Sequence, residues 1–381
     1  MCIVRLYIGD GDLNILIVKM SAIGDVTHTL PALTALRRHY PHAHIAWLIE
    51  EASVEVVRGH KALNRLLIWH RKSSIRQFRE GNRLAVVHEV RRLAKELRDT
   101  HYDLLIDFHA LLKSSLWVLL ARADRKAGFG RGMEHSEGSY LFLNERIPSI
   151  SMEVHALERG LILLNALGIP TGEVVYDFPI LEENNVEARH LLESQGMKTN
   201  GRLIAIHPTT LWPTKLWENH RFGEVADRLI ERGFQVAFTG GINDHATLDE
   251  ICRGMSHRAI RLDGQTSLKT LAAIYRLACA VLSTDTGPMH IAAAVGTPVV
   301  ALFGPTAPWR TGPYGSEHLV LRVGLDCSPC FRKSCPTDRY EAVACMHRIT
   351  VDQVVDAVLR KVRVSLGNRL DQNHIIAVNP P

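Results

Sequence analysis

The stretch Val281-Leu282-Ser283-Thr284-Asp285-Thr286-Gly287-Pro288-Met289-His290 decides how this chain folds. An apolar, strand-like run comes first, a small polar turn follows, and an alanine-rich segment begins after it. This order predicts a strand, a tight loop and a helix N-terminus, where free backbone N–H groups and the helix dipole attract an anion. Thr286 offers a hydroxyl, Gly287 allows close approach to the backbone, and Pro288 suits the first helical turn. With Asp285 beside it to accept hydrogen bonds from a polyol, the loop predicts a ligand that joins a phosphate to a sugar.

The same order of strand, turn and helix recurs along both halves of the chain. Strands are expected at 14–18, 44–49, 66–69, 103–107, 203–207, 235–239, 280–283 and 298–303. Helices are expected at 32–40, 84–100, 113–121, 154–167, 217–231, 246–254, 268–277 and 289–295. Strands that alternate with helices favour parallel, doubly wound sheets. The predicted fold class is therefore α/β, with two facing Rossmann-like domains that bind a ligand between the carboxyl edges of their sheets.

Length and composition agree with two soluble domains. The chain has 381 residues, of which 46% are hydrophobic and 22% are charged, which argues against wholesale disorder. The linker Gly168-Ile169-Pro170-Thr171-Gly172 predicts domains at 1–170 and 171–350, followed by a C-terminal helix and tail at 351–381. No apolar run is long enough to span a membrane, and Asp10 and Asp12 interrupt any signal peptide. We therefore expect a cytoplasmic protein.

The net charge of +5 is unevenly distributed. Between Arg58 and Arg98 there are 12 lysines and arginines against three glutamates, so this segment alone carries +9. One interpretation is an anionic partner, either membrane lipid or a polyanionic substrate. The alternative is a solvated basic helix. Nucleic acid is not expected, because no aromatic residues interleave the charges as a stacking platform.

The first predicted strand runs into Met20-Ser21-Ala22-Ile23-Gly24-Asp25-Val26-Thr27-His28-Thr29-Leu30-Pro31. A regular helix is expected to begin near Pro31, capped by Thr29 or Leu30, because proline fits the first turn of a helix. Residues 21–28 would then form a loop at the carboxyl edge of the sheet, where Asp25 is a candidate catalytic carboxylate. The alternative is that Asp25 only caps a helix.

In the second half, the strand at 203–207 leads into a loop that contains Thr209, Thr210 and Lys215. Hydroxyl groups and an ammonium group are the donors that bind a diphosphate. Taken alone, the two threonines are more typical of turn formers. No phosphate loop of the Walker type and no dinucleotide fingerprint follows the first strand, which argues against a kinase or a dehydrogenase.

Six pieces of the sequence form a wider pattern. They are Val18-Lys19-Met20-Ser21-Ala22-Ile23-Gly24-Asp25-Val26-Thr27-His28-Thr29-Leu30-Pro31-Ala32-Leu33, Trp47-Leu48-Ile49-Glu50-Glu51, Ile106-Asp107-Phe108-His109-Ala110-Leu111-Leu112-Lys113-Ser114, the Thr209/Lys215 loop, Asp285-Thr286-Gly287-Pro288-Met289-His290 and Phe303-Gly304-Pro305-Thr306. In this pattern the chain closely resembles glycosyltransferase family 9, the ADP-heptose:lipopolysaccharide heptosyltransferases. The first-half pieces are most similar to the heptosyltransferase I group, which adds the first heptose of the inner core. The resemblance implies the GT-B architecture, with an acceptor-binding first domain and a nucleotide-sugar-binding second domain.

The resemblance also implies site residues. Asp25 would be the general base that takes the proton of the acceptor hydroxyl. The implied donor-binding residues are Thr209, Thr210, Lys215, Asp244, Asp285, Thr286, Gly287 and His290, with the diphosphate held by Lys215 and the heptose by Asp285. The implied acceptor-binding residues are Arg71, Lys72 and Lys113. Where related chains carry a further acceptor-binding arginine, this chain reads Arg131-Gly132-Met133-Glu134-His135, so that residue stays unassigned.

The implied activity is an inverting transfer of heptose from ADP-L-glycero-D-manno-heptose to the Kdo/inner-core region of lipopolysaccharide. The acceptor would be an anionic lipid-linked sugar, Kdo–lipid A or a partial core, with peripheral contact at the inner-membrane surface. No cofactor or catalytic metal is expected, because the donor motifs contain no D-x-D pair. One alternative is a transferase of the same family with another nucleotide sugar or a lipooligosaccharide acceptor. A second alternative is a catalytically silent protein that binds nucleotide sugars.

Four of the seven cysteines are grouped near the C-terminus. Cys327, Cys330, Cys335 and Cys345 have the spacing C-x₂-C-x₄-C-x₉-C, which suits four ligands of a structural zinc ion or an iron–sulfur cluster. The alternative is a set of reduced structural thiols, because disulfides are uncommon in cytoplasmic proteins.

Overall fold

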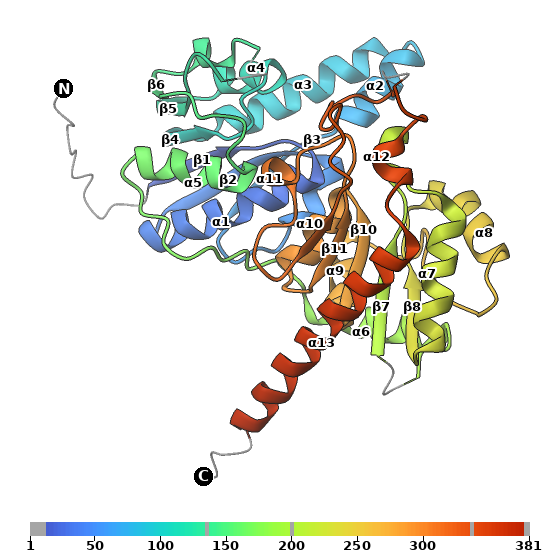
Figure 1. Ribbon diagram of the computed structural model, residues 1–381. Helices are drawn as coiled ribbons and strands as arrows, with labels where there is room; N and C mark the ends of the chain where they lie inside the picture. Colours follow the sequence, from blue (N-terminus) through green and yellow to red (C-terminus); the bar gives the residue numbers. More distant parts are fainter. Residues whose placement is uncertain (1–12, 134–136, 199–201, 336–338, 377–381) are drawn as a thin grey trace. The chain divides into compact units, whose positions relative to one another are not determined.

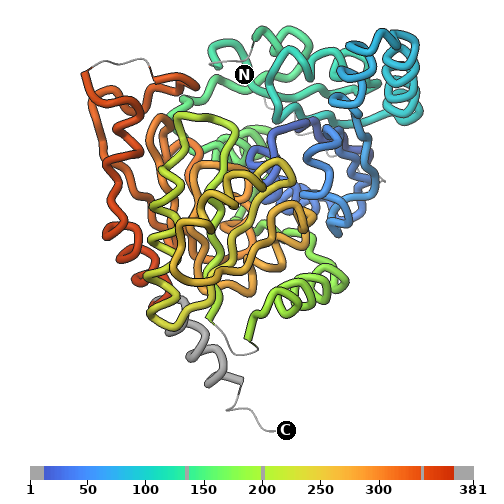
Figure 2. Tube along the Cα trace, turned by 90° about the vertical axis from the view of Figure 1, so that its right-hand side faces the viewer, coloured from blue at the N-terminus to red at the C-terminus, as the bar shows by residue number. Residues whose placement is uncertain are grey.

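The computed structural model describes residues 13–133, 137–198, 202–335 and 339–376 (Figure 1). The chain forms two compact units, residues 1–179 and 180–381, which are considered separately. Figure 2 follows the Cα trace through the first unit, from blue to green, and the second, from green to red. The division lies after Pro179, in irregular chain, and the boundary predicted after residue 170 lies earlier in the same linker.

The first unit is built on a six-stranded parallel sheet with the strand order β3-β2-β1-β4-β5-β6. Its strands are β1 Asn14–Val18, β2 His44–Glu50, β3 Arg65–Trp69, β4 Tyr102–Asp107, β5 Ala123–Phe129 and β6 Glu145–Ile147. Its α-helices are α1 Ile23–His39, α2 Arg71–Arg79, α3 Arg83–Arg98, α4 Leu112–Leu120 and α5 Ala156–Ala166, with 3₁₀ turns at Glu51–Val56 and Ser139–Phe142. The strand order reverses between β1 and β4, which is where doubly wound sheets bind ligands.

The second unit repeats this plan, with the strand order β12-β11-β10-β7-β8-β9 and all neighbours parallel. Its strands are β7 Arg202–His207, β8 Phe234–Phe238, β9 Ile260–Arg261, β10 Ala280–Thr284, β11 Val299–Leu302 and β12 Leu319–Leu321. Its α-helices are α6 Glu182–Ser194, α7 Asn219–Glu231, α8 His245–Arg253, α9 Leu268–Leu277, α10 Gly287–Ala294, α11 Pro308–Thr311, α12 Ala344–His347 and α13 Val351–Ile376, with 3₁₀ turns at Pro213–Lys215 and Ile242–Asp244. Here the order reverses between β7 and β10.

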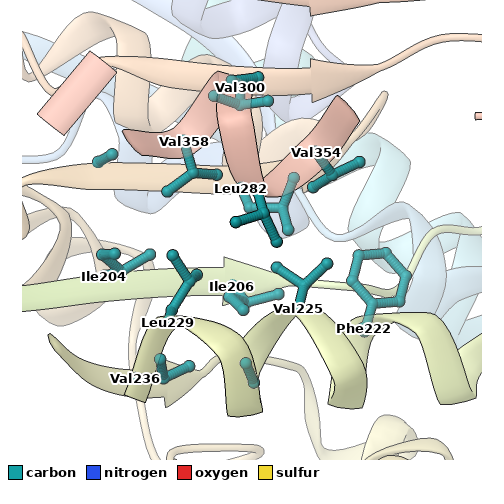
Figure 3. Close-up of a cluster of buried hydrophobic side chains, with 14 of the residues drawn as sticks. Ile204, Ile206, Phe222, Val225, Leu229, Val236, Leu282, Val300, Val354 and Val358 are labelled. Atoms are coloured by element: carbon teal, nitrogen blue, oxygen red, sulfur yellow. The ribbon is translucent and has the colours of Figure 1, made fainter. Parts of the chain in front are cut away.

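The C-terminal helix α13 belongs to the core of the second unit. Its Val354 and Val358 are fully buried against the sheet, together with Phe222 and Leu229 of α7 and Leu282 of β10 (Figure 3). α7 and α13 lie side by side in both views of the chain (Figures 1 and 2). The first part of the segment predicted as a separate helix and tail is therefore integral to this unit; residues 377–381 lie outside the described residues.

The prediction of two Rossmann-like α/β units is confirmed, but the predicted start of the first helix is wrong. α1 begins at Ile23 and continues through Pro31, so residues 23–28 are helical and do not form a loop. Pro31 has no N–H to donate to the carbonyl of Thr27, four residues earlier. The helix tolerates this loss because nearly all of its residues from Val26 to Leu36 are buried.

The basic stretch that begins at Arg71 is helical in the structure. It forms the first turn of α2, where Glu51 accepts hydrogen bonds from the backbone N–H and the hydroxyl of Ser73 at 3.1 and 3.2 Å. Ser74 donates to the carbonyl of His70 at 2.9 Å. Within the described residues, no helix is both long enough and apolar enough to cross a bilayer.

Candidate functional site

A cavity of about 360 Å³ opens at the switch point of the first unit. The loops after β1 and β4 line it, together with residues of α1, α4 and α5. Its polar lining includes Lys19, Asp25, His28, His109, Lys113 and Arg159. The sheet topology therefore brings side chains from distant parts of the sequence to one point.

Asp25 lies in the first turn of α1 and lines this cavity, half-buried. Its Oδ2 accepts a hydrogen bond from the backbone N–H of Ala22 at 3.2 Å. The helix-capping geometry considered from the sequence is therefore present. It does not exclude a catalytic role, since a carboxylate that accepts one hydrogen bond keeps further lone pairs for a second partner.

Lys19 is a partly buried cation of the cavity. Its Nζ donates to the carbonyl of Phe108 at 3.1 Å. Burial lowers the pKa of Lys19, and the nearby carboxylates of Asp25 and Asp107 oppose this shift. Burial, assisted by Lys19 and Lys113, lowers the pKa of His109 to about 2, so this imidazole is neutral.

Two of the three predicted acceptor-binding residues are joined by a buried carboxylate. Lys113 Nζ donates to Ser21 Oγ at 2.6 Å and pairs with Glu50 Oε1 at 3.1 Å, and Arg71 Nη1 lies 3.8 Å from Glu50 Oε2. Of the three predicted residues, only Lys113 lines the cavity; Arg71 is linked to it through Glu50, and Lys72 is exposed on α2. Glu50 was not predicted as a site residue. Its position at the end of β2, next to β1 in the sheet, is the signal that identifies it.

At the switch point of the second unit, the side chains of three other residues contact Asp285. Its Oδ2 lies 2.6 Å from Lys215 Nζ and accepts a hydrogen bond from Thr306 Oγ1, also at 2.6 Å. Its backbone carbonyl lies 3.4 Å from the hydroxyl of Thr210. Three of the residues predicted to bind the donor therefore meet, and Thr306 joins them although no role was predicted for it.

Thr209 and Asp244 are hydrogen-bonded to each other at the same carboxyl edge of the second sheet. Asp244 Oδ2 accepts from Thr209 Oγ1 at 3.0 Å and from the backbone N–H of Gly241 at 2.7 Å. That Asp244 binds the donor remains a prediction. In the structure, its carboxylate ties the loop after β8 to the loop after β7.

The N-terminus of α10 completes this set of groups. Thr286 is its N-cap residue, with an extended backbone and no capping hydrogen bond from its side chain. Gly287 opens the helix, and His290 is buried one turn later. A helix start of this kind presents backbone N–H groups and a partial positive charge to an anion.

The four grouped cysteines lie close to one another. The pKa of Cys345 is raised to about 11, first by burial and then by the neighbouring thiols of Cys330, Cys327 and Cys335. All four are free cysteines. Within the described ranges, no group of three or more histidine, cysteine or acidic side chains is arranged to hold a metal ion. Cys2, Glu134 and His135 lie outside those ranges.

A buried histidine predicts how the second unit responds to acid. Burial lowers the pKa of His207 to about 4, against 6.5 in an unfolded chain, and its Nδ1 lies 3.0 Å from the hydroxyl of Thr239. Between these two pH values the unfolded chain binds a proton on this histidine that the folded chain does not. The contribution of His207 to the free energy of unfolding is therefore complete above pH 6.5 and is lost as the pH falls towards 4. The loss is expected to reach about 3 kcal/mol.

Urea unfolding from pH 7.5 to 4.5 measures this dependence. His207→Gln should make it shallower, whereas His220→Gln, at an exposed position of α7, should not. An unchanged slope in His207→Gln would contradict the assignment.

With this geometry in place, the chain can be compared with known proteins. The family model described as glycosyltransferase family 9 (heptosyltransferase) matches residues 90–341. Lipopolysaccharide heptosyltransferase 1 of Pseudomonas aeruginosa is 32% identical over 330 residues, which cover 85% of this chain and 87% of that protein.

Solved structures have the same fold. A family 9 glycosyl transferase from Veillonella parvula superposes with a TM-score of 0.77 at 24% identity, over 92% of this chain and 98% of that one. The E. coli heptosyltransferase WaaC, solved with ADP, gives a TM-score of 0.72 at 24% identity, over 92% and 100%. Together with the two parallel sheets, these likenesses confirm the predicted GT-B fold class.

Proposed function

Because the chain belongs to glycosyltransferase family 9, we propose that it transfers heptose from ADP-L-glycero-D-manno-heptose to the Kdo/inner-core region of lipopolysaccharide. The observation that carries this proposal is the cluster of Lys215, Asp285 and the α10 N-terminus at one sheet edge. It combines an ammonium group and helix N–H groups for a diphosphate with a carboxylate for sugar hydroxyls. The matching relative is itself named a lipopolysaccharide heptosyltransferase 1.

The two units have different tasks in this reaction. When the bond between the anomeric carbon and ADP breaks, negative charge grows on the diphosphate, and Lys215 with the α10 N-terminus stabilises it. Asp25 takes the proton from the acceptor hydroxyl as the new bond forms. Attack on the face opposite to ADP inverts the anomeric carbon. Arg71, Lys72 and Lys113 bind the anionic acceptor sugar.

A panel of nucleotide sugars tests the proposal directly. Purified protein should bind ADP-heptose more tightly than UDP- or GDP-sugars and should release ADP only when a Kdo–lipid A acceptor is present. Tight binding of a different nucleotide sugar would favour another donor within the family. Binding of ADP-heptose without turnover on any lipid-linked acceptor would favour a silent binding protein.

Turnover is expected to persist in excess EDTA. In the second unit, the groups placed to stabilise a leaving diphosphate are an ammonium group and a helix N-terminus, so catalysis does not need a divalent cation there. The measurement is the initial rate immediately after EDTA is added, with and without Mg²⁺. Circular dichroism is the control, since slow loss of a structural metal would unfold the protein. Immediate inactivation that Mg²⁺ reverses, with an unchanged spectrum, would contradict the expectation.

A surface of the first unit supports peripheral contact with an anionic membrane. The hairpin of α2 and α3, residues 71–98, exposes Ile75, Phe78, Leu84 and Val87, which are 40%, 57%, 73% and 42% exposed. Arginines surround them, and the guanidinium group of Arg83 lies 5.9 Å from the centre of the Phe78 ring. Apolar side chains bordered by cations suit the interface of anionic lipids. The same helix α2 begins with Arg71, beside the cavity that would receive the acceptor sugar.

Phe78→Ser is expected to lower binding to phosphatidylglycerol-containing vesicles by about fivefold to tenfold, because a large apolar side chain no longer enters the interface. Val186→Ser is the matched control, since Val186 is 55% exposed on α6 of the other unit. Cosedimentation at low and moderate salt gives the two affinities. Equal losses in both variants would rule out a specific role for the hairpin.

A further inference from the structure

The segment that carries three of the four grouped cysteines is hydrogen-bonded to two loops of the proposed donor site. We define residues 327–335, which follow β12, as the cysteine strap. On one side the strap is bonded to the loop after β11: the N–H groups of Cys330 and Phe331 donate to the carbonyl of Pro305 at 3.0 and 2.8 Å. The hydroxyl of Ser328 donates to the carbonyl of Gly304 at 2.5 Å. The strap therefore holds the residues immediately before Thr306.

On its other side the strap is bonded to the loop after β7. The buried hydroxyl of Thr214 donates to the backbone carbonyl of Arg332 at 2.7 Å. Thr214 is the neighbour of Lys215. The strap thus joins the two segments that carry Lys215 and Thr306, the two side chains that contact Asp285.

The strap also places a second cation beside Lys215. The Nζ of Lys333 lies 5.6 Å from the centre of the Trp212 ring, and the Nζ of Lys215 lies 4.6 Å from the same centre. Lys215 has a carboxylate partner in Asp285, whereas in the described part of the chain no carboxylate pairs with Lys333. Both ammonium groups lie within 5.6 Å of the centre of one indole ring, so two positive charges gather at this loop, and an anion is the ligand that they attract.

We propose that the cysteine strap is a wall of the nucleotide-sugar site and that Lys333 supplies a second ammonium group to the donor diphosphate. This inference rests on the proposed function, because the anion is the diphosphate of an ADP-sugar. The fourth grouped cysteine packs against the loop to which the strap is bonded. Cys345 lies against Gly304, where an added Cβ would come within 2.9 Å of the Cys345 Sγ. The role of the grouped cysteines in this arrangement is to pack the strap onto the loop that carries Thr306.

Calorimetry with ADP and with adenosine, which has no phosphate, tests the role of Lys333. Lys333→Ala is expected to weaken ADP by about threefold to tenfold, the range for an exposed charged contact, and to leave adenosine unchanged. The dependence of ADP affinity on salt should become shallower, and Lys333→Arg should restore both. Lys198→Ala removes the same charge at the opposite edge of the sheet and should have no effect.

A double-mutant cycle tests the strap itself. Thr214→Val removes the hydrogen bond to Arg332, so the effects of Thr214→Val and Lys333→Ala should not be additive. Additive effects would overturn the role of the strap in positioning Lys333. Normal ADP affinity and an unchanged salt dependence in Lys333→Ala would overturn the inference while the proposed function stands. A wild-type protein that binds no ADP would overturn both.

Discussion

Asp25→Asn is expected to lower the turnover number by about 100- to 10,000-fold, the usual contribution of a positioned general base. The amide cannot take the proton of the acceptor hydroxyl. Its oxygen still accepts the hydrogen bond from Ala22, so the start of α1 is kept. Initial rates at saturating donor and acceptor measure the effect.

Asp25→Ala separates catalysis from helix capping. It removes both functions, and the loss of the cap is expected to cost about 1 kcal/mol of unfolding free energy that Asp25→Asn retains. ADP affinity should stay unchanged in both variants, because the groups assigned to ADP lie in the second unit. Wild-type turnover in Asp25→Asn would show that Asp25 only caps the helix.

Lys215→Ala is expected to weaken ADP and ADP-heptose by about 1.5–3 kcal/mol, the contribution of a charged hydrogen bond. Both ligands should be weakened, since the proposed contact of the ammonium group is with phosphate and not with sugar. Isothermal titration calorimetry measures the two affinities.

The stability of the Lys215 variant needs its own control. Removal of the ammonium group leaves the buried carboxylate of Asp285 with Thr306 as its remaining side-chain partner in the described structure, and an uncompensated buried charge is destabilising. Asp285→Asn combined with Lys215→Ala removes this charge, so the double variant should regain stability without regaining ADP affinity. ADP affinity equal to the wild type in Lys215→Ala would show that the lysine does not contact the phosphates.

The elements that hydrophobic periodicity marks clearly were predictable. All eight expected strands are present, because runs such as Ile15–Val18 in β1 are buried on both faces of their sheets and therefore read as continuous apolar segments. Strands β5, β6, β9 and β12 were not predicted. The last three are only two or three residues long, and β5, with the sequence Ala-Asp-Arg-Lys-Ala-Gly-Phe, has no such run and is only partly buried in its first half. Helix α1 was shortened because Pro31 is normally a boundary signal, and the burial that overrides it is a tertiary effect.

The site was predictable to the level of loops but not of contacts. Parallel topology places the loops after β7 and β10 together, which brings Lys215 near Asp285 from 70 positions away in the sequence. It does not show that the two side chains pair. Glu50 and Lys333 were missed because each acts through a neighbour that only the folded chain supplies: Glu50 through Lys113, and Lys333 through the ring of Trp212.

In the proposed reaction, the ion pair between Lys215 and Asp285 has one effect when the donor binds and another after the sugar has been transferred. An arriving diphosphate must draw the ammonium group away from a carboxylate, and the hydroxyls of the attached sugar can take its place on that carboxylate. The intact donor replaces both partners of the pair, whereas ADP replaces only one. Once the sugar has left, Asp285 competes again for Lys215, 2.6 Å away in the resting chain. The pair thus favours the substrate over the spent nucleotide and promotes the departure of ADP.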